Sequence, residues 1–186
     1  MRDVPGGTQM THRERLLTET FVSLADTLVG DFDMVEFLSL LSGRCVDLLG
    51  AEEAGLMLTD ADGHMRPAAS SSHRMKTLEL LEIQYDEGPC PDAFRTGVAV
   101  SCADLGEAQE RWPTFALEAL AAGFRSAHAI PMRLRNNVIG ALNLIGTTVG
   151  PMDADDQLVA QALADVATIG ILHHRAAQEA KVVTGQ

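Results

Sequence analysis

The sequence predicts a mixed α/β domain that has helices at both ends and strands between them. Apolar residues recur at steps of three and four in the first fifty residues and again after Asp153, which is the spacing of amphipathic helices. Two pairs of short apolar runs flank turn residues, as in β-hairpins. Residues 138–145 are apolar with little alternation, which predicts a central strand covered on both faces.

The first fifty residues predict two helices behind a short leader. Residues 1–10 contain one proline, two glycines and no apolar periodicity, so we expect a flexible leader. The first helix begins near Thr11 and ends at Gly30, because glycine is the usual residue at a helix end. The second begins at Asp33, where Glu36 completes the pattern of a capping box, and ends at Gly50.

A hairpin follows these helices. Residues 55–59 and 64–70 are short runs that flank Asp60-Ala61-Asp62-Gly63, and Gly63 supplies the positive φ of a tight turn. The aspartates do not form an EF-hand loop, because His64 stands where the oxygen ligands would have to continue.

The middle of the chain is less regular. Residues 73–86 have helical spacing, and the two prolines and the glycine of residues 86–91 end that helix. Beyond it we expect a turn at residues 94–97, a strand at 98–102, a polar loop at 104–112 and a helix at 113–122 with Pro113 in its first turn.

The C-terminal part predicts a second hairpin and a long helix. Residues 126–134 and 138–147 are joined by Arg135-Asn136-Asn137, and asparagine tolerates the left-handed conformation of a tight turn. Asp153 caps the last helix, where negative charge near the N-terminus is favourable.

Composition excludes several classes of protein. The formal charge of −12 argues against a large nucleic-acid footprint, which requires clustered basic residues. Cys45, Cys90 and Cys102 lack the spacing of a zinc site, so we expect no metal and a reducing, cytoplasmic environment. The apolar runs are too short to span a membrane, and there is no phosphate loop, nucleophile elbow or H-E-x-x-H motif.

The ordered set of elements and motifs resembles a GAF domain over residues 11–175. The motifs are Glu87-Gly88-Pro89-Cys90, the segment 123–132 and the strand 138–144. More narrowly, E-G-P-C followed by residues 93–97 is similar to the sensor half of the actinobacterial GAF–ANTAR antitermination regulators.

The resemblance implies a central antiparallel β-sheet with helices on both faces. The first, second and last helices would cover one face, and a ligand pocket would lie on the other, under residues 73–112. RNA binding in that family belongs to an ANTAR domain, which is absent from these residues. We therefore divide the chain into a leader at 1–10, a GAF domain at 11–175 and a C-terminal helical extension at 176–186.

Seven residues are candidates to line the pocket: Tyr85, Cys90, Phe94, Trp112, Phe115, Phe124 and His128. The aromatic residues fit an ordinary hydrophobic core equally well. Cys90 follows two acidic residues, which favour a structural thiol over a reactive thiolate. His128 lies inside an apolar strand, so it either lines the pocket or is a buried histidine with a hydrogen-bond partner. The sequence names no cofactor: it lacks the N-K-F-D-E signature of cyclic-nucleotide-binding GAF domains, and a haem would have only His128 as a candidate axial ligand.

Two functions remain open. The first is a regulatory sensor domain without enzymatic activity that binds an unidentified small molecule, as part of a transcription antitermination regulator. The second is a GAF-fold enzyme of the free methionine sulfoxide reductase type, which works through several cysteines whose spacing is not reproduced here.

We also expect a homodimer with no membrane contact. Its interface would join two apolar helix stripes, made of Leu17, Phe21, Leu24 and Leu28 in the first helix and of Ile169, Leu172, Ala176 and Ala180 in the last. Residues 173–184 would then form a signalling helix that is ordered by dimerisation.

Overall fold

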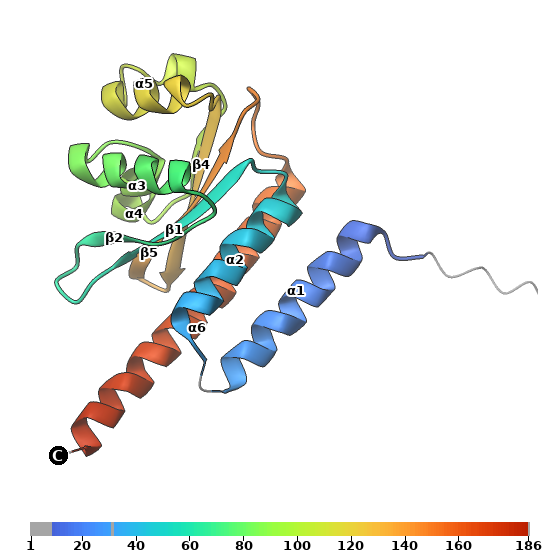
Figure 1. Ribbon diagram of the computed structural model, residues 1–186, viewed down its shortest axis with the longest axis vertical. Helices are drawn as coiled ribbons and strands as arrows, with labels where there is room; N and C mark the ends of the chain where they lie inside the picture. Colours follow the sequence, from blue (N-terminus) through green and yellow to red (C-terminus); the bar gives the residue numbers. More distant parts are fainter. Residues whose placement is uncertain (1–8, 31, 186) are drawn as a thin grey trace, which may run out of the picture.

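The computed structural model, which describes residues 9–30 and 32–185, has one five-stranded antiparallel sheet in the order β2-β1-β5-β4-β3. Helices α3, α4 and α5 cover one face, and α2 and α6 cover the other, with α1 packed against both of them (Figure 1). The elements are α1 (His12–Val29), α2 (Met34–Leu49), β1 (Glu53–Thr59), β2 (Met65–Ser70), α3 (His73–Tyr85), α4 (Pro89–Thr96), β3 (Val100–Cys102), η1 (Leu105–Glu107), α5 (Pro113–Ala121), β4 (Ser126–Leu134), β5 (Asn137–Gly146) and α6 (Ala154–Thr184). The predicted mixed α/β class with an antiparallel sheet is confirmed.

Helices α1 and α2 begin where local capping dictates. At Thr11 a complete capping box forms with Glu14, a feature that the sequence analysis did not identify. Asp33 accepts a hydrogen bond from the backbone N–H of Glu36 at 2.9 Å, as expected for an N-cap. Gly50 then ends α2 in the left-handed conformation, with a φ of 60°.

Helix α1 is held against α6 at both of its ends. Near its start Arg13 forms an ion pair with Asp156, and near its end Leu28 packs over Gly170. A Cβ atom at Gly170 would overlap the Leu28 side chain, so the glycine allows the close approach of the two helices. Helix α1 therefore belongs to the packed fold.

This packing bears on the predicted dimer interface. Leu24 is fully buried within one chain, and Leu17, Phe21, Leu28 and Leu172 are partly buried against the same core. The other three predicted residues, Ile169, Ala176 and Ala180, are exposed. The dimer remains a prediction, and the surface still open to it lies on α6.

The segment after α3 differs from the prediction. Residues 94–97, expected as a turn, are the end and C-cap of helix α4, which begins at Pro89. Both of its prolines lie in the first turn, where backbone N–H groups have no partner within the helix, so proline is tolerated there. In the second hairpin, Arg135 rather than an asparagine adopts the left-handed conformation, with a φ of 55°.

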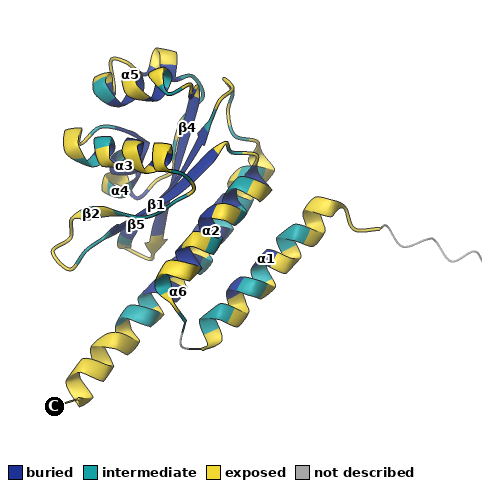
Figure 2. Ribbon diagram, in the orientation of Figure 1, coloured by how far each residue is buried: buried dark blue, intermediate teal, exposed yellow. Residues whose placement is uncertain are grey.

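The described residues at both ends of the chain are exposed. Of the predicted leader, residues 1–8 lie outside the described part of the chain, and Gln9 and Met10 are exposed without regular structure. Helix α6 runs unbroken to Thr184, and its residues from Ala176 onward are exposed and extend past the sheet (Figure 2). Among the described residues, no helix is both long and apolar enough to cross a membrane.

Candidate functional site

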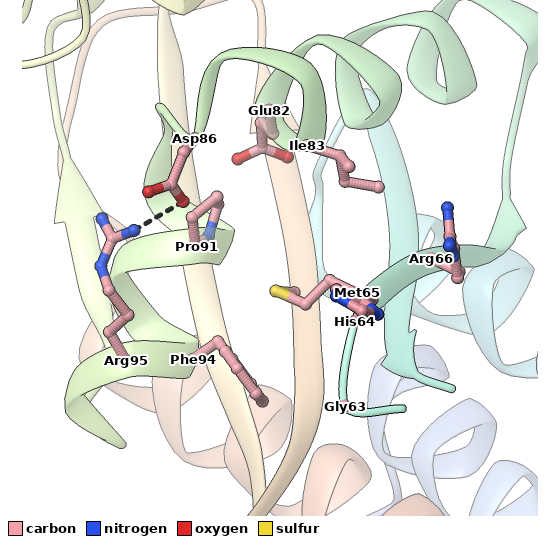
Figure 3. A pocket seen from close by; sticks show the side chains of 10 residues that line it. All are labelled: Gly63, His64, Met65, Arg66, Glu82, Ile83, Asp86, Pro91, Phe94 and Arg95. Atoms are coloured by element: carbon pink, nitrogen blue, oxygen red, sulfur yellow. Dashed lines mark hydrogen bonds and ion pairs between the residues drawn. The ribbon is translucent and has the colours of Figure 1, made fainter. Parts of the chain in front are cut away.

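A pocket of about 450 Å³ opens between α3, α4 and the turn that leads into β2 (Figure 3). Its lining residues are Gly63, His64, Met65, Arg66, Glu82, Ile83, Asp86, Pro91, Phe94 and Arg95. Met65, Ile83, Pro91 and Phe94 give it an apolar body. Among these lining residues, Glu82 has an ionisable side chain that is fully buried.

Glu82 joins three elements through its carboxyl group. Its Oε1 accepts a hydrogen bond from the backbone N–H of Cys90 at 3.1 Å, and its Oε2 accepts one from Asn143 Nδ2 at 2.8 Å. These bonds link α3 to α4 and to β5. Gly88 passes beside the same carboxyl with a φ of 122°, and a Cβ atom there would overlap Oε1. Both its conformation and the space beside it therefore require a glycine.

A second buried glutamate lies one turn earlier on the same face of α3. Glu79 is fully buried, and its Oε2 accepts a hydrogen bond from the Ser70 hydroxyl. Its Oε1 lies where a Cβ of Gly55 would be, and Gly55 is the β1 partner of Asn143 in the sheet. In the described part of the chain, Glu79 Oε1 and Asn143 Oδ1 are buried and lack a hydrogen-bond partner.

Burial decides the protonation of these two glutamates. It raises the pKa of Glu79 from its ordinary value of 4.5 to about 8, and the Ser70 hydrogen bond and the charge of Lys76 act in the opposite direction without offsetting it. The pKa of Glu82 is raised well above the ordinary range, first by burial and further by the negative charges of Glu79 and Asp92. Within residues 9–30 and 32–185, neither glutamate forms an ion pair. At neutral pH the pair therefore keeps protons.

The basic residues at the rim of the pocket already contact acids. Arg95 pairs with Asp86 at 2.6 Å and with Asp92, while Arg66 Nε lies 3.1 Å from Asp60 Oδ2. Asp60 Oδ1 also accepts the backbone N–H groups of Asp62 and His64, which fixes the hairpin turn.

Asp60, Asp62 and His64 offer three possible metal-ligand atoms within 4.8 Å of one another. Asp60, which is half-buried, holds the turn through its hydrogen bonds from the backbone N–H groups of Asp62 and His64.

Of the seven predicted pocket residues, one lines this pocket and two lie next to residues that line it. Phe94 lines it, and Cys90 lies behind it, where its backbone N–H bonds Glu82 and its side chain packs with Met57 and Ala141. Tyr85, at the end of α3, is 47% exposed and does not line the pocket.

Three of the predicted aromatic residues form hydrophobic core instead. Trp112, Phe115 and Phe124 are buried with Met75 and Leu78 in a separate cluster under α3 and α5. The Trp112 and Phe115 rings meet edge to face with centroids 6.0 Å apart. These three side chains therefore pack in the core and do not line the pocket between α3 and α4.

His128 lies on the opposite face of the sheet from the pocket. Its neighbours Ala127 and Ala129 face α3–α5, so alternation along β4 directs His128 toward α6. Its Nδ1 lies 2.7 Å from the Ser101 hydroxyl, and burial lowers its pKa. His128 lines a different cavity of about 480 Å³ and cannot share a ligand with Phe94.

Glu79, Glu82 and Asn143 were not among the residues predicted for the site. Met75, Leu78, Glu79 and Glu82 follow one stripe of a helix, so the two acids occupy positions that apolar residues usually fill. Asn143 likewise interrupts an otherwise apolar strand. Polar residues at core positions were the available signal.

Comparisons with known proteins agree with this architecture. The GAF domain family model matches residues 33–171, more than half of the chain. No curated protein sequence matches the chain. Solved structures similar to it show the fold alone, because their sequence identities are low. One is the GAF domain of a phosphoenolpyruvate-protein phosphotransferase from Acinetobacter, with a TM-score of 0.68 and 12% identity, covering 90% of this chain and 97% of that one.

Two further similar structures come from proteins of different kinds. Free methionine-R-sulfoxide reductase from Neisseria meningitidis has a TM-score of 0.65 and 17% identity, covering 91% of this chain and 96% of that one. A GAF domain/HD domain protein from Geobacter sulfurreducens has a TM-score of 0.62 and 19% identity, covering 82% and 98%. The matched family model and the shared fold together establish that this chain belongs to the GAF domain family.

Proposed function

We propose that this chain is the small-molecule-sensing domain of a regulatory protein and that its ligand binds in the pocket between α3 and α4. GAF domains are typically sensory and regulatory modules. The observation that carries the proposal is a pocket with apolar walls and one fully buried carboxyl group, which no basic residue in the described part of the chain neutralises. A few convergent polar groups in an apolar cavity are typical of small-molecule sites.

A route from this pocket to the exposed part of α6 supports a sensing role. The Arg175 guanidinium donates a hydrogen bond from Nη2 to the backbone carbonyl of Thr59 at 2.8 Å. Thr59 ends β1, and the hairpin that follows it supplies Gly63, His64 and Met65 to the pocket wall. A ligand that shifts this hairpin would therefore pull on α6 at the point where the helix leaves the fold (Figure 1).

The narrower proposal is that the domain serves a transcription antitermination regulator. Its support is the E-G-P-C segment, whose residues all have structural roles beside the pocket. Glu87 Oε2 accepts the backbone N–H groups of Thr114 and Phe115 and so caps α5, at 2.7 and 3.1 Å. Gly88 makes room for Glu82, Pro89 begins α4, and the N–H of Cys90 bonds Glu82.

RNA binding would then reside in an ANTAR domain outside these residues. We expect the 186-residue chain alone to leave the electrophoretic mobility of an RNA hairpin unchanged at physiological salt. A salt-sensitive shift by this chain would place RNA contacts in the GAF domain itself and contradict that division of labour.

The alternative of a methionine sulfoxide reductase receives less support from the cysteines. Cys45 is buried on the α2 side of the sheet, and burial raises its pKa to about 12. Burial likewise raises the pKa of Cys90 well above its ordinary value and that of Cys102. Thiols held protonated in this way are poor nucleophiles. Turnover of free methionine sulfoxide with reduced thioredoxin would favour the enzyme over the sensor.

Filling the pocket tests the proposed function. We would screen small molecules by thermal shift and compare wild-type protein with Ile83→Trp, which places a large side chain in the pocket wall. Leu80→Trp is the matched control, because Leu80 lies on the exposed side of the same helix. We expect ligands that stabilise the wild type and the control but not Ile83→Trp. Equal stabilisation of all three proteins would move the site elsewhere.

A further inference from the structure

We propose that the ligand carries a protonated amine or amidine group, which hydrogen-bonds to Glu82 in the pocket between α3 and α4. This inference rests on the proposed function, because it names the chemical class of the ligand that the same pocket would bind. The remaining apolar walls would contact an apolar body attached to that group.

The carboxyl group of Glu82 has unused hydrogen-bonding capacity. Its two oxygens each accept one hydrogen bond, from the Cys90 N–H and the Asn143 amide. An ionised carboxylate can accept about four hydrogen bonds, so each oxygen has a free site. Both present donors are neutral. A buried carboxylate is stable in its charged form only when a cation accompanies it, and the described part of the chain supplies none.

The balance of charge around the pocket favours a cationic ligand. Arg95 and Arg66, the two arginines that line it, contact Asp86, Asp92 and Asp60. An anionic ligand would lie beside the acids Glu82 and Asp86, and both arginines that could bind it are already paired with acids. A cationic group would instead meet the Glu82 carboxyl group, which has no basic partner in the described part of the chain.

The buried groups next to Glu82 are short of hydrogen-bond donors. Glu79 Oε1 and Asn143 Oδ1 are both buried without a donor, and both groups lie on the same face of the sheet around Gly55. Burial raises the pKa of both glutamates, so in the unliganded state both stay protonated at neutral pH. The cluster of Glu79, Glu82 and Asn143 is thus built to accept donors.

Binding then has a defined proton balance. A cationic N–H group that reaches Glu82 favours the ionised carboxylate, so the O–H bond of the Glu82 acid breaks and its proton passes to the buffer. The ligand keeps its own proton and its positive charge. Each bound cation should therefore release close to one proton at neutral pH.

Three probes of the same size test the inference. Benzamidinium carries an amidinium group on an aromatic ring, benzamide is its neutral counterpart, and benzoate is its anionic counterpart. We expect benzamidinium to bind wild-type protein at least about tenfold more tightly than benzamide, a difference of about 1.4 kcal/mol. Benzoate should not bind. Calorimetry in two buffers of different ionisation enthalpy should show the released proton.

The variant Glu82→Gln should bind benzamidinium and benzamide with equal affinity. Glutamine has the same shape, and its amide can still accept the Cys90 N–H while donating to Asn143 Oδ1 after the asparagine amide turns over. Glu118→Gln, at an exposed position of α5, is the control and should keep the preference of the wild type. Circular dichroism would confirm that both variants fold.

The outcomes separate this inference from the proposed function. If benzamide binds wild-type protein as tightly as benzamidinium and Ile83→Trp abolishes both, the pocket stands and the cationic class is wrong. A preference for benzamidinium that survives Glu82→Gln also overturns the inference, as does a failure of benzamidinium to bind at millimolar concentration. Binding that persists in Ile83→Trp contradicts the pocket itself.

Discussion

Replacing Glu79 with glutamine should reduce the loss of stability that the domain suffers as pH rises. The pKa of Glu79 lies at about 8 in the folded protein against an ordinary value of 4.5, because burial disfavours its charged form. The unfolded chain releases this proton at a lower pH than the folded chain. The stability that Glu79 contributes is therefore fully present below pH 4.5 and is lost as pH rises toward 8.

The magnitude follows from the same two values. Between pH 4.5 and pH 8 each pH unit lowers the free energy of unfolding by about 1.4 kcal/mol. Raising the pH from 4.5 to 7 therefore removes about 3 kcal/mol of stability. Glu82 acts in the same direction. Glutamine at position 79 has no proton to release, and its side-chain oxygen can still accept the hydrogen bond from the Ser70 hydroxyl.

Urea unfolding between pH 5 and pH 8 measures this effect, with the fluorescence of Trp112, the single tryptophan of the chain, as the signal. The free energy of unfolding of Glu79→Gln minus that of the wild type should grow by about 1 kcal/mol or more per pH unit. His128 titrates in the same range with the opposite sign, because its pKa is lowered, but it is common to both proteins and cancels. Curves that run parallel for the two proteins would refute the burial of an unpaired, protonated Glu79.

Three further substitutions test other parts of the structure. Gly88→Ala should cost about 1–3 kcal/mol of unfolding free energy in urea, because alanine is strained at a φ of 122° and its Cβ overlaps Glu82, whereas Gly43→Ala, in an open helical position, should be neutral or stabilising. Arg175→Met should change the free energy of unfolding by about 1 kcal/mol or less. It should remove the ligand-induced NMR shifts of α6 and keep those of residues 63–66. Retention of the α6 shifts would exclude the contact between Arg175 and Thr59 as the route from the pocket to α6. Ala176→Glu with Ala180→Glu should weaken a homodimer in analytical ultracentrifugation and leave the thermal transition of the core largely intact, and an unchanged dissociation constant would remove this helix from the interface.

Local signals in the sequence predicted most elements of the fold. The caps at Asp33 and Asp153, the turn at Gly63 and the apolar strand at 138–145 all depend on neighbouring residues, and all agree with the structure. Helix α4 was missed because prolines that usually break a helix lie in its first turn.

The site was harder to predict because it depends on contacts between distant residues. Glu82 meets Asn143 across 61 positions of the sequence, and nothing local to either residue indicates this pairing. The separation of His128 from Phe94 depends on which face of β4 each element covers. Two acids on the buried stripe of α3 were nevertheless visible in the sequence, and charged residues at core positions are a strong signal for a functional site.

The most direct test is to measure the protonation of Glu82 itself. Carbon-13 labelling of glutamate side chains would allow each carboxyl group to be followed by NMR as a function of pH, with Glu82→Gln and Glu79→Gln assigning the two buried signals. We expect both to titrate well above 4.5, and we expect saturating benzamidinium to lower the apparent pKa of Glu82. If Glu82 titrates near 4.5 with the exposed glutamates, and benzamidinium leaves its apparent pKa unchanged, then Glu82 is not a buried, protonated acid that binds a cationic ligand.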